Sequence, residues 1–320
     1  MRTAAIAAAI ALIGQGPAQA DSIDVTEGGL GATFARLDGA PGVTVEGKGV
    51  VFIAGSGPTD RNGNSRLGVN AGYLRQLSDA LVRDGIYTLR YDKRGVRASK
   101  AALTSESGLR FTNFVADAQN WAGWLRAKPG VACIFLLGHS QGGLVATLAA
   151  PQASAAGLVL LSSPGRTFGA LLADQLAGAP MGATLKADAL TIVRDLEAGK
   201  TATDVNPGLR RLFRPSVQPF LISLLNINPA AELAKLKTPT LIISGTHDLQ
   251  VTDTGFERLV AARPDATAIR IPGMNHVLKE APAARKPNLA TYTDPDLPLA
   301  PGLVDAVTGF VDKTACPATG

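Results

Sequence analysis

The chain has 320 residues, of which 46% are hydrophobic and 18% are charged. This composition excludes a disordered chain and allows either one large α/β domain with an insertion or two small domains. The formal net charge of +5 is spread along the sequence without a long Lys/Arg run, so we expect no nucleic-acid partner.

The first twenty residues follow the three-part pattern of a secretory signal peptide. Arg2 supplies the positive charge, residues 3–13 form an apolar run, and Ala18-Gln19-Ala20 is a cleavage site of small residues. The run is too short to span a bilayer, and we expect no membrane span elsewhere. We predict a signal peptide over residues 1–20, cleaved after Ala20, and a periplasmic or secreted protein. The alternatives are an N-terminal anchor and an Ala-rich helix of the fold.

Further along the chain, apolar strands alternate with helices. The glycine-rich residues 25–45 predict an opening hairpin. Later strands are predicted at 49–54, 86–91, 131–137, 157–161, 240–244 and 268–271. Helical patterns cover 71–83, 114–127, 144–150 and 303–311. This alternation predicts the α/β class, with a mainly parallel sheet flanked by helices.

One long stretch interrupts the alternation. Between Pro164 and Pro239 the sequence has helical periodicity but no convincing strand. We predict a helical lid over residues 165–228, inserted into a core made of residues 21–164 and 229–320. The alternative is an ordinary crossover, although the stretch is much longer than most connections.

The hexapeptide Gly138-His139-Ser140-Gln141-Gly142-Gly143 lies between a predicted strand and a predicted helix. In that context Gly-x-Ser-x-Gly indicates a nucleophile elbow, a strained turn whose flanking positions need glycine. The alternative is an ordinary glycine-rich turn with a solvent-exposed serine, which would have the same sequence pattern. We predict that Ser140 is a nucleophile.

A serine nucleophile needs a histidine base, and the chain has three histidines. We expect His139, inside the elbow, to point away from Ser140. His247 precedes the candidate acid. His276 follows the last predicted strand, and it alone satisfies the chain order serine, acid, histidine.

The acid is expected on a loop at the end of a strand. Asp248 follows the predicted strand 240–244, while the loop after strand 157–161, residues 162–165, contains no carboxylate. Asp248 is therefore the predicted acid. Asp253 is the runner-up, and we expect it to open a helix as its N-cap.

Acyl transfer also needs two donors for an oxyanion. We predict the backbone N–H of Gln141 and that of Ser56, with Gly57 as the alternative to Ser56. The loop of residues 55–57, which carries Ser56 and Gly57, would also be explained as a plain turn.

Two pairs of charged residues are expected to have supporting roles. We expect Asp92 and Arg94, at a strand end, to brace loops, and Asp60 and Arg61 either to do the same or to line the pocket.

The two cysteines, Cys133 and Cys316, are compatible with one disulfide in an oxidising compartment or with two unrelated thiols. A disulfide would tie the C-terminal tail onto the sheet. The sequence leaves both alternatives open.

From about residue 50 onward the chain resembles the α/β-hydrolase superfamily. The resemblance rests on residues 138–142, on Gly245-Thr246-His247-Asp248 and on Asn275-His276. The chain is most similar to a bacterial serine-esterase branch that has three characteristic segments. These segments are Gly-Ser-Gly-Pro-Thr-Asp-Arg, Tyr-Asp-Lys-Arg-Gly and Asn-His-Val-Leu-Lys, and they stand here at residues 55–61, 91–95 and 275–279. Many superfamily members have His-Gly where this chain has Ala54-Gly55. The resemblance implies ester hydrolysis without a cofactor under a helical cap.

Together these patterns predict a serine hydrolase that cleaves carboxylic esters through Ser140, His276 and Asp248. The expected partner is a small-molecule ester, and the apolar lid is expected to form a pocket for short to moderate acyl chains. An aminopeptidase-like serine peptidase is the first alternative, and a non-catalytic binding protein is the second. No metal site is predicted, because His and Cys lack ligand spacing. Nothing indicates an oligomeric state.

Overall fold

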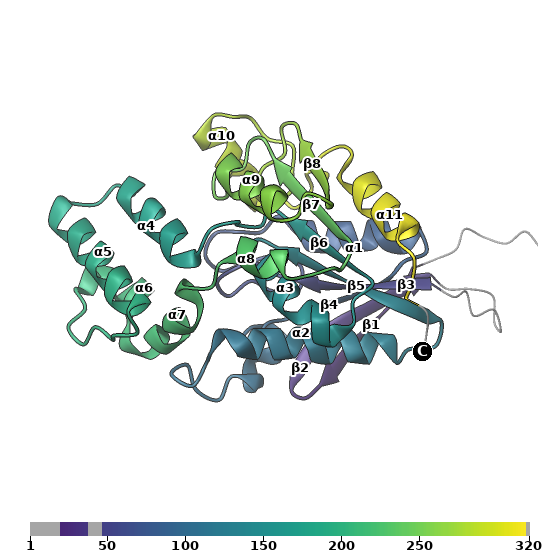
Figure 1. The fold of residues 1–320 in the computed structure, drawn as a ribbon, viewed down its shortest axis with the longest axis horizontal. Coiled ribbons are helices and arrows are strands. Elements are labelled where there is room, and N and C mark those ends of the chain that lie inside the picture. The colour runs from purple at the N-terminus through teal and green to yellow at the C-terminus, as the bar shows by residue number, and fades with distance from the viewer. Residues whose placement is uncertain (1–19, 38–46, 318–320) are drawn as a thin grey trace, which may run out of the picture.

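The computed structural model describes residues 20–37 and 47–317 of the chain. A single sheet of eight strands lies at its centre, with helices on both faces (Figure 1). Most of the predicted signal peptide, residues 1–19, lies outside the described residues. Ala20 already belongs to the first strand.

The strands occur in the spatial order β1-β2-β4-β3-β5-β6-β7-β8. Their bounds are β1 (Ala20–Glu27), β2 (Leu30–Leu37), β3 (Gly47–Ile53), β4 (Tyr87–Tyr91), β5 (Val131–His139), β6 (Gly157–Leu161), β7 (Thr240–Gly245) and β8 (Thr267–Ile271). Strands β1 and β2 are antiparallel, and β2 also pairs antiparallel with β4. From β4 to β8 every pairing is parallel, as the alternation of strands and helices predicted.

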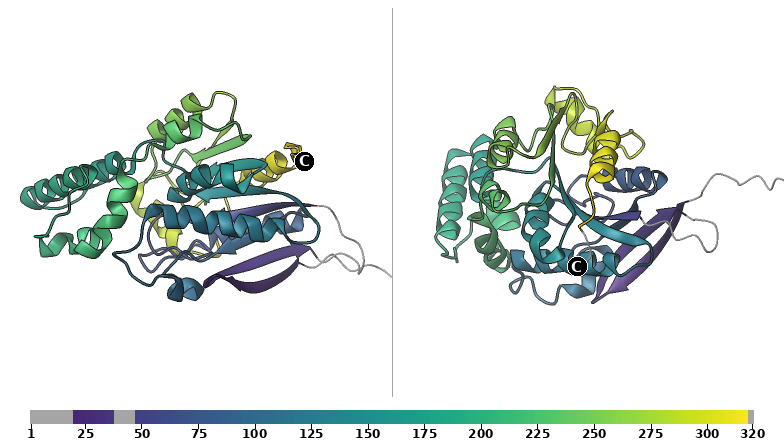
Figure 2. Two further views of the ribbon diagram at one scale, coloured as in Figure 1. Left: turned by 60° about the horizontal axis from the view of Figure 1, so that its bottom comes forward. Right: turned by 45° about the vertical axis from the view of Figure 1, so that its right-hand side comes forward.

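The helices that cover this sheet are α1 (Tyr73–Arg83), α2 (Phe111–Arg126), α3 (Gln141–Ala153), α8 (Pro229–Ala234), α9 (Asp253–Ala262) and α11 (Leu303–Lys313). A short helix, α10 (Arg285–Ala290), lies in the segment between β8 and α11. Helices α1 and α11 pack on one face, and α2, α3, α8 and α9 pack on the other (Figures 1 and 2).

The strand sequences explain the two-sided core. In β3, Val50 and Phe52 join the apolar cluster under α1 and α11, whereas Val51 and Ile53 join the cluster under α2 and α3. Successive side chains of a strand point to opposite faces, so a continuous apolar run is buried on both sides.

The opening hairpin lies earlier than predicted. It spans residues 20–37 rather than 25–45, and the predicted end, residues 38–45, lies outside the described residues. Its two-residue turn is Gly28-Gly29, with φ of 55° and 78°. Two consecutive positive φ values are those of a type I′ turn, in which glycine is favoured.

Residues between β6 and β7 are helical in α4 (Phe168–Gly178), α5 (Ala183–Glu197), α6 (Arg210–Phe213) and α7 (Gln218–Leu225). These helices share an apolar cluster of their own, which includes Leu172, Val193 and Leu221. They project from one side of the sheet, whereas α8 packs against α3 and α9 (Figure 1). That these helices act as a lid remains a prediction.

A disulfide joins Cys133 to Cys316, with 5.5 Å between their Cα atoms. It ties the segment after α11 to the first half of β5, so the disulfide alternative left open by the sequence is the correct one. The Lys48 ammonium holds the same segment by donating to the carbonyl oxygens of Val311, Asp312 and Thr314, each at 2.8 Å. No helix among the residues described is long and apolar enough to cross a membrane.

Candidate active site

Ser140 lies in the turn between β5 and α3. Its backbone has φ 53° and ψ −125°, a conformation that non-glycine residues rarely adopt. A Cβ on Gly138 would lie 2.2 Å from the carbonyl oxygen of Gly142, and one on Gly142 would lie 2.2 Å from that of Ile53. Only glycine fits at these two positions, so the pattern Gly-x-Ser-x-Gly is a steric requirement of this turn.

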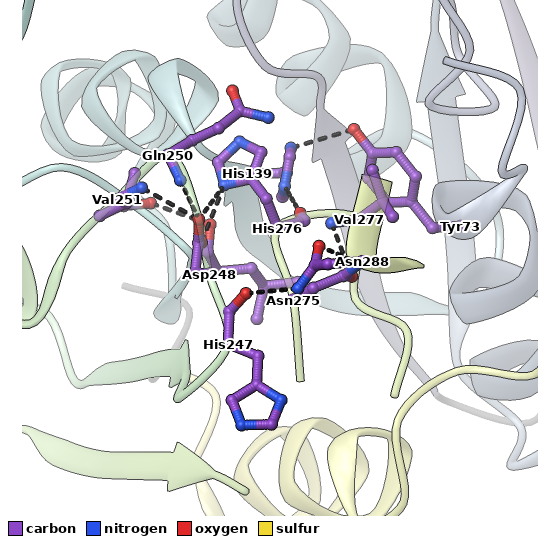
Figure 3. Close-up of polar contacts among 12 residues, drawn as sticks. Tyr73, His139, His247, Asp248, Gln250, Val251, Asn275, His276, Val277 and Asn288 are labelled. Carbon is purple, nitrogen blue, oxygen red and sulfur yellow. Dashed lines mark hydrogen bonds and ion pairs between the residues drawn. The ribbon is translucent and has the colours of Figure 1, made fainter. Parts of the chain in front are cut away.

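The loops after β7 and β8 bring Asp248 and His276 together. His276 Nδ1 lies 2.8 Å from Asp248 Oδ2 and 3.1 Å from Oδ1 (Figure 3). The carboxylate is fully buried, and its Oδ1 accepts hydrogen bonds from the backbone N–H groups of Gln250 at 2.8 Å and Val251 at 2.9 Å. Burial alone would raise the pKa of Asp248, but His276 and these N–H groups outweigh it and hold the pKa below its ordinary value.

Two contacts explain why these loops meet. The N–H of His247 donates to the carbonyl oxygen of Met274 at 3.0 Å. The same oxygen lies so close to Gly245 that a Cβ added there would be only 2.0 Å from it, so only glycine allows the two loops to approach. The imidazole of His247 instead contacts the carbonyl oxygen of Ala281 at 2.6 Å, so His247 supports the loop and is separate from the pair.

Asp253, the alternative acid, is the first residue of α9 and pairs with Arg270. The prediction that it is the N-cap is wrong by one residue, because Thr252 holds that position. Asp253 makes no contact with His276 among the interactions of the described residues.

Asn275 supports the loop of His276, a role that the sequence patterns did not predict. The Asn275 amide is fully buried, donates to Thr291 Oγ1 at 2.7 Å and accepts from the N–H groups of Val277 and Lys279 at 3.2 and 3.1 Å. Asn288 reaches the same network and donates to the carbonyl oxygen of His247 at 2.9 Å (Figure 3). An asparagine directly before the histidine was the available signal.

His139 also contacts His276. Its Nε2 lies 2.7 Å from the His276 carbonyl oxygen, its Nδ1 lies 3.1 Å from the Tyr73 hydroxyl, and the two imidazole centroids are 4.8 Å apart (Figure 3). Burial, with the neighbouring His276, lowers the pKa of His139 to about 3. A neutral imidazole donates once, and a carbonyl oxygen only accepts, so Nε2 carries the proton and Tyr73 donates to Nδ1. His139 thus fixes the backbone of His276, a role that its position in the elbow did not indicate.

The predicted oxyanion donors lie beside Ser140. Gln141 is the first residue of α3, so its N–H has no helical acceptor. A Cβ added to Gly55 would lie 3.2 Å from Ser140 Cβ, which shows how closely the loop of residues 55–57 approaches Ser140. Among the described residues, no acceptor is bonded to the N–H of Ser56.

Asp92 and Arg94 brace neighbouring segments, as expected. Asp92 accepts from the N–H and the guanidinium of Arg61, both at 2.8 Å, and so holds the loop after β3. Arg94 pairs with Asp117 of α2 at 2.6 Å. Lys93 was not singled out by the sequence. It is only 5% exposed, donates to the carbonyl oxygens of Gly55 and Gly57, and burial lowers its pKa to about 7.

Ser140 and His276 open into one cavity of about 470 Å³. Its other walls come from the loop between β3 and α1 and from Gln250, Leu289 and Tyr292. Residues 165–228 do not line this cavity, so the expectation that the lid forms the substrate pocket is wrong for it. The walls come instead from His139, from Ser140 itself and from residues within 55–73 and 250–292. Among its described lining residues none is Asp, Glu, Lys or Arg.

A serine on a strained strand-to-helix turn and a buried Asp–His pair at the ends of parallel strands are features of the α/β hydrolases. Residues 50–285 match the family model described as "Alpha/beta hydrolase family". The chain therefore belongs to this family.

Three known proteins are similar to this chain in sequence or in fold. Esterase EstD of Thermotoga maritima is 26% identical over 263 residues, which cover 76% of this chain and 58% of that protein, so this chain spans little more than half of its length. Est1E from Butyrivibrio proteoclasticus, a solved structure, has a TM-score of 0.56 at 15% identity, covering 92% of this chain and 98% of its own. Proline iminopeptidase from Mycobacterium smegmatis has a TM-score of 0.50 at 15% identity, with 80% and 92% covered. The two solved structures, at 15% identity, show a shared fold, and the family match places the chain among the α/β hydrolases.

Proposed function

We propose that the protein is a serine esterase that cleaves small, uncharged carboxylic esters and belongs to the esterase branch of its family. The observation that carries this proposal is the shared cavity of Ser140 and His276, with Asp248 bonded to the far side of the imidazole. No hydrogen bond joins Ser140 to His276 among the described residues. Such contacts often tighten only when substrate is bound.

The proposed reaction follows from these positions. Asp248 accepts from Nδ1–H of His276, which leaves Nε2 free to take the proton of the Ser140 hydroxyl. The Ser140 oxygen attacks the ester carbonyl, and the Gln141 and Ser56 N–H groups bind the oxyanion. His276 then returns the proton to the departing alcohol. A water molecule, deprotonated by His276, then attacks the acyl-enzyme, and His276 gives this proton to the Ser140 oxygen as the acid is released.

The cavity lining favours an ester over an aminopeptidase substrate. A free α-amino group is cationic near neutral pH and needs an acidic side chain when it is buried. The described lining contains no carboxylate, and its polar groups are neutral, such as Ser56, Thr59 and Tyr292. The named activity of the relative EstD points the same way. The likeness to proline iminopeptidase, at 15% identity, concerns the fold alone.

The test is hydrolysis of p-nitrophenyl acetate, butyrate and octanoate, a feruloyl ester and an aminoacyl p-nitroanilide by the wild type and by Ser140→Ala. The feruloyl ester is included because Est1E has been solved with ferulic acid bound. We expect ester turnover that Ser140→Ala abolishes and Ser22→Ala, on the exposed face of β1, preserves. Full activity of Ser140→Ala, or faster cleavage of the anilide, would refute the proposal. Labelling of Ser140 by a fluorophosphonate would exclude a non-catalytic protein.

We also propose that residues 1–20 are removed on export and that the mature protein is periplasmic or secreted. The Cys133–Cys316 disulfide supports this proposal, because disulfides persist in oxidising compartments. Mass spectrometry of the exported protein should give Asp21 as the first residue. Retention of the protein in the cytoplasm with its leader intact would contradict it.

The helices of residues 165–228 are proposed as a lid, because they share a separate apolar cluster beside the sheet. Hydrogen–deuterium exchange of α4–α7 before and after fluorophosphonate labelling tests this role. Slower exchange in the labelled protein supports a lid. Unchanged exchange would leave these helices as a structural crossover.

A further inference from the structure

Lys93 is a buried cation whose partners are backbone carbonyl groups. It follows β4, and its ammonium donates to the carbonyl oxygens of Gly55 and, at 2.5 Å, Gly57. The Phe114 ring centroid lies 5.7 Å from Nζ. No carboxylate pairs with Lys93 among the described residues, in contrast to Arg61 and Arg94 beside it. Burying a lysine without an acidic partner costs folding free energy, so the hydrogen bonds to these carbonyl groups have to compensate for it.

The two carbonyl groups bracket the predicted oxyanion donor. The carbonyl of Gly55 and the N–H of Ser56 belong to one planar peptide unit and point in opposite directions. Holding the carbonyl oxygen therefore sets the direction of the N–H. Hydrogen bonding to an ionised donor also polarises the peptide unit, which makes its N–H a stronger donor.

The remaining carbonyl of the loop is held as well. Thr59 Oγ1 donates to the carbonyl oxygen of Ser56 at 2.8 Å. Lys93 and Thr59 thus bind three successive carbonyl groups, those of residues 55, 56 and 57. The N–H of Ser56, in contrast, has no acceptor among the described residues. An N–H that is oriented but unbonded is the arrangement that an oxyanion requires.

This peptide unit also lies next to the nucleophile. The Cβ that Gly55 lacks would be 3.2 Å from Ser140 Cβ, and Ser56 lines the same cavity as Ser140 and His276. A larger residue at 55 would push the loop away from the serine.

We propose that Lys93 is a positioning residue that anchors and polarises the Gly55–Ser56 peptide unit, so that the Ser56 N–H completes the oxyanion site. This inference rests on the proposed Ser140 mechanism. It favours Ser56 over Gly57 because a Cβ at position 55 would meet Ser140, whereas one at position 57 would meet only Leu67. Both protonation states of the amine keep at least two N–H donors, so the anchoring holds in either state, and the ammonium adds the polarisation.

The test is Lys93→Met, which keeps the length and apolar stem of lysine and removes its donors. Loss of a whole oxyanion donor costs about 10²–10³ in kcat, so we expect a weakened donor to cost about 10- to 100-fold. KM should stay within about threefold, since the oxyanion forms only after substrate binds. A trifluoromethyl ketone, which forms an oxyanion on adding to Ser140, should lose affinity by the same factor as kcat.

Lys48→Met is the matched control. Lys48 also donates to backbone carbonyl groups, but at the opposite end of β3, so its loss should change stability and leave kcat unchanged. If Lys93→Met does not fold, Lys93→Gln keeps a polar amide that is too short to reach both carbonyl groups and should show the same losses. Wild-type kcat, or unchanged ketone affinity, in a folded Lys93 variant would overturn the inference. Activity in Ser140→Ala would instead overturn the reaction on which it rests.

Discussion

Replacing Asp248 by Asn separates the charge of the acid from its shape. In the structure, Asp248 Oδ1 accepts from the N–H groups of Gln250 and Val251, and Oδ2 accepts from His276 Nδ1. An Asn side chain has one acceptor oxygen. That oxygen satisfies the two backbone N–H groups, so the Asn amide N–H₂ faces His276.

The amide would then donate to Nδ1 and shift the imidazole proton to Nε2, the nitrogen that accepts the proton of Ser140 in the proposed mechanism. The wrong tautomer costs about 10⁴ in kcat in a serine protease with a Ser–His–Asp triad, equivalent to about 5 kcal/mol in the activation free energy. We expect a loss of this size in Asp248→Asn. KM and the thermal midpoint should change little, because the shape and the backbone contacts persist.

The assay is kcat and KM on p-nitrophenyl acetate, together with the rate of fluorophosphonate labelling. Asp253→Asn is the matched control, since Asp253 bonds to Arg270 at the start of α9 and should be dispensable. A folded Asp248→Asn enzyme with more than about a tenth of wild-type kcat would refute the tautomer argument. So would a larger loss in Asp253→Asn.

Two further predictions concern stability. The disulfide closes a loop with a sequence separation of 183, so Cys133→Ser/Cys316→Ser should lower the unfolding free energy by about 5 kcal/mol in the chain-entropy model. A thermal midpoint equal to that of the wild type would contradict this. Burial lowers the Lys93 pKa from 10.5 to about 7, so between these pH values the unfolded chain binds a proton that the folded protein releases. As the pH rises through this window, the unfolding free energy of the wild type should increase relative to that of Lys93→Met by up to about 1.4 kcal/mol per pH unit. Urea unfolding at several pH values measures this difference, and a difference that falls with pH would contradict the prediction.

Much of this arrangement could be predicted because local signals agreed with the fold. The apolar strand runs, the glycines around Ser140 and the chain order of Ser140, Asp248 and His276 all reflect constraints that act within a few residues or along the chain. The structure places Asp248 against His276 and places Ser140 in the same cavity.

What sequence reasoning missed depends on contacts between distant segments. Tyr73, His139 and the His276 backbone meet across separations of 66 and 137 residues, and Lys93 reaches Gly55 across 38. No periodicity records such pairings. The pocket walls were assigned to residues 165–228 because those helices are apolar, but their apolar side chains largely pack on one another.

The fastening of the C-terminal segment has a practical consequence. Cys316 and the residues bound by Lys48 hold this segment at the edge of the sheet where β3 and β5 begin, whereas Ser140 follows the end of β5. A solid support coupled just after Cys316 would therefore lie on the side of the molecule away from the cavity of Ser140 and His276. Immobilised protein should keep its cavity open to dissolved substrate without a long spacer.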